Sequence, residues 1–135
     1  MKSKSWKILV VDDEEDLSWS ISNSLRRCNN ELEVQCAQDG NQAFEMLRQH
    51  SYDLVISDYR MPGKDGLELL KQIRRRYSKT KVIIMTAYGS TEVQSIVEKC
   101  KDTYYLEKPF DILDLKKMIC QINGNKDFLF KNALN

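Results

Sequence analysis

The sequence predicts an α/β fold, a single doubly wound (βα)5 domain of the flavodoxin-like type with a five-stranded parallel sheet. Strand-like and helix-like patterns alternate five times along 135 residues, a length that suits one domain with one core. The strand-like runs are short and continuously apolar, as expected of strands that are buried on both faces. Each run is followed by apolar residues at helical spacing, which favours parallel strands joined by crossover helices.

The first two units occupy residues 7–50. The runs at 7–11 (KILVV) and 32–37 predict strands. A helix from Glu14 presents apolar residues at helical spacing, namely Leu17, Ile21, Leu25 and Cys28. Trp19 lies off that stripe, so it is either exposed or widens the buried face. A second helix over 41–50 turns three residues inward: Ala43, Phe44 and Leu47.

The remaining three units occupy residues 54–124. Strands are predicted at 54–56, 81–85 and 104–106, and a helix at 67–77. The fourth and fifth helices carry the apolar stripes Val93, Ile96, Val97, Cys100 and Ile112, Leu115, Ile119, Ile122. Gly124 is a plausible stop for the last helix. We expect residues 1–123 to form the domain and residues 124–135 to be a C-terminal tail or linker remnant.

The predicted strand order is 2-1-3-4-5, which places a reactive cleft at the carboxyl ends of the first and third strands. Asp12 and Asp13 directly follow the first strand, and Asp58 follows the third. Each acid alone could cap a helix. Three carboxylates in one cleft repel each other, however, and require a compensating cation or shifted pKa values. Magnesium, a hard cation that prefers oxygen ligands, supplies that compensation.

Two further strand ends fit the same cleft. Thr86 follows the fourth strand and offers a hydroxyl, and Lys108 follows the fifth and offers an ammonium group for phosphoryl oxygens. The Lys108–Pro109 bond is a candidate cis peptide, although the base rate for X–Pro bonds is low. After Asp58, the pairs Pro62-Gly63 and Asp65-Gly66 predict a loop that keeps the aspartate accessible before the next helix starts.

Composition excludes several other classes of protein. With 21 basic and 20 acidic residues the net charge is +1, which gives no general basic field for nucleic acid or anionic membrane. No apolar run approaches the roughly 20 residues that span a bilayer, and residues 1–7 do not resemble a signal peptide, so we expect a cytoplasmic protein. Four scattered cysteines without a CxxC pair indicate half-buried apolar residues (Cys28, Cys36, Cys100, Cys120), and the single histidine speaks against a zinc site.

The pattern of Asp12-Asp13, Asp58, Thr86 and Lys108-Pro109 resembles, one for one, the signature of response-regulator receiver domains of two-component signalling. The segments DYRMPGKDG, IMTAYGS and YLEKPFD are similar to the nitrogen-regulator branch, whose receivers often precede an ATPase and a DNA-binding module. The resemblance covers roughly residues 6–123. It departs from the family at Lys101-Asp102, where Gly-Ala is usual, and this affects the expected end of the fourth helix.

The resemblance implies that Asp58 is the phosphoacceptor and takes its phosphoryl group from a sensor histidine kinase or phosphotransfer protein. It implies magnesium ligation by Asp13, Asp58 and the backbone carbonyl of Arg60, with Asp12 acting largely through water. Thr86 and Lys108, with the Ala87 N–H, would contact the transferred group.

The resemblance also implies a switch. Thr86 would move inward and Tyr105 would rotate into the vacated space, which changes the surface of helix four, strand five and helix five. That surface would favour a homodimer, a partner or an output module. Arg60 and Tyr88, beside Ala87, would flank the pocket and tune the lifetime of the phosphoaspartate.

Three alternatives compete with this interpretation. A magnesium phosphohydrolase of the haloacid-dehalogenase type would need DxD after the first strand and a cap insertion, and the chain has neither. An interaction module independent of phosphorylation fits poorly with the complete set of acids, Thr86 and Lys108. A nucleotide-binding domain would need a glycine-rich fingerprint after the first strand, which the sequence lacks.

Overall fold

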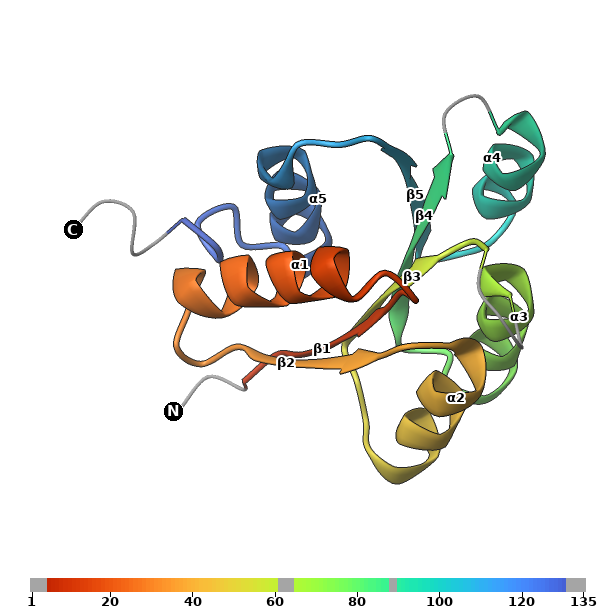
Figure 1. Ribbon diagram of the computed structural model, residues 1–135, viewed down its shortest axis with the longest axis horizontal. Coiled ribbons are helices and arrows are strands. Elements are labelled where there is room, and N and C mark those ends of the chain that lie inside the picture. The colour runs from red at the N-terminus through yellow and green to blue at the C-terminus, as the bar shows by residue number, and fades with distance from the viewer. Residues whose placement is uncertain (1–4, 61–64, 88–89, 131–135) are drawn as a thin grey trace.

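The structure is a computed structural model that describes residues 5–60, 65–87 and 90–130 (Figure 1). Its single sheet has five parallel strands in the order β2-β1-β3-β4-β5. The strands are β1 (Lys7–Val11), β2 (Glu33–Ala37), β3 (Leu54–Asp58), β4 (Lys81–Ala87) and β5 (Thr103–Lys108). The helices are α1 (Glu15–Cys28), α2 (Gly40–Gln49), α3 (Gly66–Arg76), α4 (Thr91–Glu98) and α5 (Ile112–Asn123). The predicted fold class and strand order are confirmed.

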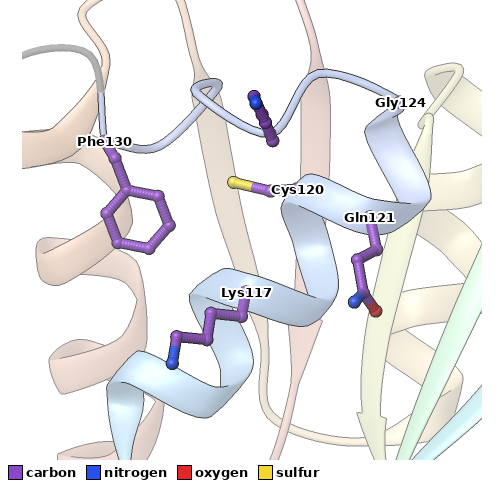
Figure 2. Close-up of a pocket in the computed structure, with 6 residues that line it drawn as sticks. Lys117, Cys120, Gln121, Gly124 and Phe130 are labelled. Atoms are coloured by element: carbon purple, nitrogen blue, oxygen red, sulfur yellow. The ribbon is translucent and has the colours of Figure 1, made fainter.

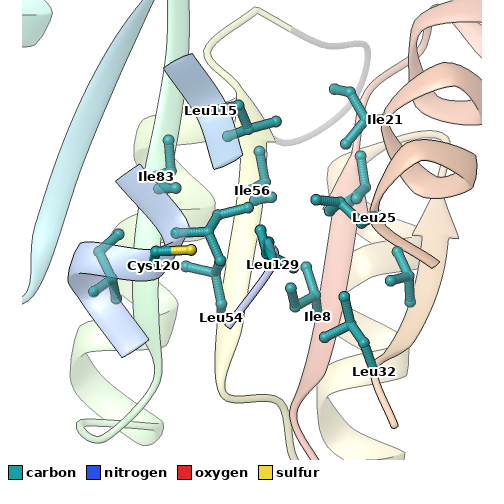
Figure 3. Packing of buried hydrophobic residues seen from close by; sticks show 14 of the residues in the cluster. Ile8, Ile21, Leu25, Leu32, Leu54, Ile56, Ile83, Leu115, Cys120 and Leu129 are labelled. Atoms are coloured by element: carbon teal, nitrogen blue, oxygen red, sulfur yellow. The ribbon is translucent and has the colours of Figure 1, made fainter. Parts of the chain in front are cut away.

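The helices cover both faces of the sheet, as Figure 1 shows, with α1 and α5 on one face and α2, α3 and α4 on the other. Alternate residues of β1 belong to the two apolar layers on opposite faces of the sheet. Ile8 and Val10 pack with α1 and α5, whereas Leu9 and Val11 pack in the opposite layer. This alternation explains why β1 is apolar at every position rather than at every second one. Figure 3 shows the layer beneath α1 and α5, which also includes Leu129 from beyond the last helix.

Three strands extend further at their carboxyl ends than the sequence predicts. The structure includes Asp58 in β3, Thr86 in β4 and Lys108 in β5. The register places Asp58 opposite Met85 and Ala87 opposite Lys108. The sequence underestimates these strands because polar residues end the apolar runs, while the backbone ladder continues past them. The side chains of interest are therefore held on strands rather than on loops.

The structure settles two points about individual side chains. Trp19 is 68% exposed, so it does not widen the buried face of α1. Cys36 on the edge strand β2 is exposed, contrary to the expectation for all four cysteines. Among the described helices, none has the length and hydrophobicity that crossing a bilayer requires.

The end of α4 departs from the family pattern without losing the left-handed turn. Asp102 has φ 55° and is the one non-glycine residue with positive φ in the described part of the chain. An aspartate tolerates this region better than most residues because its short polar side chain bonds locally. The turn leads into β5, since the carbonyl of Asp102 accepts a hydrogen bond from the N–H of Val82 at 3.1 Å. The left-handed residue is therefore Asp102, at the position where alanine is usual, and not Lys101, at the position where glycine is usual.

We predict that Asp102→Gly stabilises the domain by about 0.5 kcal/mol. Glycine removes the strain of a Cβ at positive φ, while the Lys81–Asp102 ion pair at 3.8 Å, which is partly exposed, contributes little. The matched control is Asp102→Ala, which loses the same ion pair but keeps the Cβ. Urea unfolding should separate the two variants by about 1 kcal/mol, and equal stability of the two would contradict the argument.

Candidate functional site

Three carboxylates meet at the carboxyl edge of the sheet. Asp12 and Asp13 follow β1, Asp58 ends β3, and one oxygen from each lies within 4.8 Å of the others. The backbone holds both segments in place. The N–H of Asp12 donates to the carbonyl of Ala37 at 3.1 Å, and the N–H of Tyr59 donates to that of Met85 at 2.8 Å. The convergence that strand order 2-1-3-4-5 predicts is present in the structure.

The two acids that follow β1 have different surroundings. Asp12 is 1% exposed, and its Oδ1 accepts a hydrogen bond from the N–H of Glu14 at 2.8 Å. Its carbonyl accepts a bond from Ser18 Oγ at 3.3 Å. Asp13, in contrast, is exposed. Asp12 is therefore fixed by the first turn of α1, while Asp13 faces solvent beside it.

Lys108 joins the acids from the far side of the site. Its Nζ lies 3.3 Å from Asp12 Oδ2 and 3.3 Å from Asp58 Oδ1. A third carboxylate, that of Glu14, lies 3.6 Å away. The Lys108–Pro109 peptide bond is cis. One ammonium group thus connects the ends of β1, β3 and β5.

Burial and the attraction between opposite charges shift the pKa values of these groups in opposite directions. Burial raises the pKa of Asp58 above its ordinary value because it disfavours the carboxylate, and Lys108 only partly offsets this. The pKa of Asp12 is raised for the same reason, against the hydrogen bond from Glu14 and the attraction of Lys108. Burial alone would lower the pKa of Lys108, but Asp12 and Asp58 together raise it. The ammonium group therefore stays charged, and the acids remain undercompensated.

Thr86 and Gly66 complete the surroundings of Asp58. Thr86 is 1% exposed, and its Oγ1 has no hydrogen-bond partner within the described ranges. A buried hydroxyl without a partner is costly and often marks a missing ligand. At Gly66, a Cβ would lie 2.5 Å from the carbonyl oxygen of Asp58 and 2.8 Å from Tyr59 Cα. Only glycine lets the start of α3 approach the backbone of Asp58 so closely.

The other residues expected at the site lie around its edge. Arg60 is exposed, with its guanidinium carbon 5.7 Å from the centre of the Tyr59 ring. Ala87 is exposed at the end of β4, and Tyr105 is half-buried in β5. Tyr88, Pro62 and Gly63 lie outside the described residues. Sequence reasoning missed the contact of Glu14 with Lys108, and it assigned Gly66 to the loop rather than to the start of α3. Their signals are an acid next to the Asp12-Asp13 pair and a glycine at the start of a helix.

The donor set fits a divalent cation of the magnesium type. Three carboxylates at the ends of two adjacent strands lie within 4.8 Å of one another, and one lysine contacts two of them, so the acids exceed the positive charge at the site. Magnesium takes oxygen ligands from one or two carboxylates and keeps several waters, and the exposed Asp13 leaves room for them. Asp12, Asp13 and Asp58 are the residues that could hold the ion.

The chain matches the response regulator receiver domain family over residues 8–120. It belongs to this family. Among curated proteins it is similar to the DNA-binding transcriptional regulator NtrC of Escherichia coli (strain K12), with 37% identity over 105 residues, 78% of this chain and 22% of NtrC. It is 34% identical to the Regulatory protein AtoC of the same strain over 113 residues, 84% of this chain and 24% of AtoC. The receiver domain thus resembles the NtrC branch and spans about a quarter or less of the length of these relatives.

Solved structures agree with this family. The chemotaxis response regulator CheY4 of Vibrio cholerae matches with a TM-score of 0.78 and 29% identity, over 87% of this chain and 98% of that one. A two component transcriptional regulator AraC from Clostridium phytofermentans ISDg matches with a TM-score of 0.80 and 28% identity, over 89% and 94% of the two chains. The receiver fold predicted from the sequence is therefore shared with experimentally determined relatives.

We predict that, in a chelating buffer near pH 7, Asp58→Asn raises the melting temperature of the receiver domain by a few degrees. A carboxyl group whose pKa is raised by folding binds more protons in the folded state. Without metal, its contribution to stability is therefore lost as pH rises from 3.8 through the folded pKa. Asparagine removes this cost. Magnesium should raise the melting temperature of the wild type, because a ligand of the folded state stabilises that state.

The control for this prediction is Asp53→Asn, which removes a carboxylate at the start of β3 that bonds the N–H of Lys7. This variant should lose stability and keep the magnesium response. A wild type that melts at the same temperature in magnesium and in chelator would exclude the metal site.

Proposed function

We propose that the domain is a phosphoacceptor. Asp58 receives a phosphoryl group from the phosphohistidine of a sensor histidine kinase or phosphotransfer protein, with Mg²⁺ as cofactor. The observation that carries the proposal is the placement of the Asp58 carboxylate. It lies within 4.8 Å of two other acids and 3.3 Å from Lys108. The matching receiver family supports this function.

In the proposed reaction an Asp58 carboxylate oxygen forms a bond to phosphorus while the bond between phosphorus and the imidazole nitrogen breaks. The electron pair of that bond stays with the imidazole, which takes up a proton. A carboxylate is a weak nucleophile, so the protein contributes positioning and charge stabilisation rather than activation. The rigid end of β3, packed against Gly66, fixes the direction of attack.

The groups around Asp58 then have distinct roles. Lys108 already bonds the Asp58 carboxylate and would contact a phosphoryl oxygen in its place. The unpartnered hydroxyl of Thr86 would donate to the same group, together with the N–H of Ala87. Magnesium, held by Asp12, Asp13, Asp58 and the backbone carbonyl of Arg60, would neutralise charge on the transferred oxygens. The domain would therefore assist its own phosphorylation and dephosphorylation without turning over small substrates.

The change of charge at Asp58 is the proposed signal. Phosphorylation adds about −1.5 to −2 charge and new acceptor oxygens, which would draw Thr86 toward the site. Tyr105 is half-buried in β5, two residues before Glu107, which is paired with Thr86 in the sheet. Tyr105 would move into the space that Thr86 leaves. The altered surface of α4, β5 and α5 would control a partner, a homodimer or an output module, by population shift between two packings. The similarity to a DNA-binding transcriptional regulator favours a role in transcription, in the cytoplasm.

We predict that incubation with magnesium and a small phosphodonor adds one phosphoryl group to the wild type and none to Asp58→Asn. The reason is that the Asp58 carboxylate lies 3.3 Å from Lys108 and ends the strand next to the one that carries Thr86. Intact mass measurement gives the readout. Lys108→Met should label at least about tenfold more slowly, since one charge-assisted contact to a phosphoryl oxygen is worth about 1.4 kcal/mol or more.

The control for labelling is Asp65→Asn, which removes an exposed aspartate that caps α3 through the N–H of Glu68. It should label like the wild type. Equal labelling of Asp58→Asn and wild type would refute the site, and multiple turnover of a generic phosphate ester would favour a phosphohydrolase.

We also predict that Arg60→Ala changes the half-life of the phosphorylated domain several-fold, and that Tyr88→Ala does the same. Arg60 is exposed beside Tyr59, two residues beyond the phosphoacceptor, where its side chain would control the access of hydrolytic water. Phosphate release after removal of the donor measures the half-life. Unchanged half-lives in both variants would contradict the proposal that these residues control the lifetime of the phosphorylated domain, without affecting the assignment of Asp58.

A further inference from the structure

The chain turns back on itself after α5. Gly124 has φ 89° and ends the helix, with its N–H bonded to the carbonyl of Cys120 at 3.0 Å. A tight turn follows at Asn125, whose Oδ1 accepts from the N–H of Asp127 at 3.0 Å. The carbonyl of Asn125 accepts from the N–H of Phe128 at 2.9 Å. These bonds give residues 125–130 (NKDFLF) a defined local structure, and we call them the C-terminal clasp.

Leu129 of the clasp belongs to the apolar core. It is 2% exposed and packs in the layer beneath α1 and α5 (Figure 3), among Ile8, Leu54 and Cys120. Figure 2 shows the Cys120 side chain directed from α5 toward the segment that leads to Phe130. Burial raises the pKa of the Cys120 thiol, and the backbone of Leu129 and Phe128 partly offsets that rise. The clasp therefore closes one end of the layer.

Phe128 contacts two segments that are distant in sequence. Its ring meets that of Trp6 edge-on, with centroids 5.4 Å apart and planes at 71°, an arrangement that aromatic pairs favour. Its carbonyl accepts a hydrogen bond from Asn29 Nδ2 at 3.1 Å. Trp6 precedes β1 and Asn29 follows α1, so both contacts lie at the amino-terminal edge of the sheet. Figure 1 shows the C-terminal segment on the same side as the entry of β1 and the end of α1.

We propose that the C-terminal clasp is a docking segment of the folded domain, seated between α1 and α5, rather than a linker. Its apolar residues occupy the open end of the layer, and the folded unit extends to Phe130 instead of ending near residue 123. The clasp fixes the exit of the chain beside its entry, at the edge of the sheet opposite to Asp58. The described chain therefore reaches Phe130 on the α1/α5 side and not as a continuation of α5.

The test uses the full chain with Trp19→Phe, which leaves Trp6 as the one tryptophan. In this background, Leu129→Ala should lower the melting temperature by about 6–15 °C, the range expected when a buried leucine is truncated in a domain of this size. The matched control is Leu113→Ala on α5. Leu113 is 43% exposed, and its truncation should cost less than about 2 °C.

A second variant reports on docking itself. Leu129→Asp should move the fluorescence emission of Trp6 to longer wavelength, because Phe128 no longer covers it, while circular dichroism shows that the helices persist. Global unfolding of Leu129→Asp also supports the proposal, since a dispensable tail tolerates a charge. These readouts do not depend on phosphorylation. Equal melting temperatures for Leu129→Ala and Leu113→Ala would overturn the proposal, as would unchanged Trp6 emission in a folded Leu129→Asp.

Discussion

The contacts of Lys108 with Asp12 and Asp58 hold together the part of the structure on which its chemistry depends. They link the ends of β1, β3 and β5, and β4 lies between β3 and β5. The lysine reaches across β4 because all strands are parallel and end at the same edge. The site thus requires a parallel sheet in which β1, β3 and β5 end close together at one edge, and the order β2-β1-β3-β4-β5 meets that requirement.

The same contacts leave a charge imbalance that the fold does not correct. One ammonium group faces Asp12, Asp58 and Glu14, with Asp13 close by. Burial raises the pKa of Asp12 and Asp58 despite the lysine, so folding without a cation works against their charge. The proposed phosphoryl transfer would use this imbalance, because an excess of negative charge favours a bound dication. The Oγ1 of Thr86, which has no hydrogen-bond partner among the described residues, points the same way, because a buried donor without an acceptor favours the binding of a further group.

Much of this could be predicted from the sequence, and the limits have physical causes. Continuous apolar runs revealed the strands, and the acids after β1 and β3 revealed the site, because strand order converts distant positions into neighbours. The lengths of β3, β4 and β5 were harder to predict. Polar residues at a strand end interrupt the apolar pattern, although the backbone hydrogen bonds of the sheet continue through them. The left-handed conformation of Asp102 could not be predicted from the sequence, because aspartate is compatible with many backbone conformations. Leu129 was missed because a glycine stop precedes it and a six-residue segment has no helical or strand periodicity.

The candidate site and the clasp lie at opposite edges of the sheet. Asp58 lies at the carboxyl edge, whereas Phe128 contacts Trp6 and Asn29 at the amino edge. Between them lies the layer of Ile8, Leu54, Leu115 and Cys120, which is packed without exposed members. Close-packed layers of this kind pass on small displacements as shifts between discrete packings rather than absorbing them. α5 packs in the same apolar layer as Tyr104 and Leu106 of β5, the strand that carries Lys108, and its own end is followed by the clasp. In the proposed switch, α5 would therefore be the element that links a change of charge at the carboxyl edge to the clasp at the amino edge.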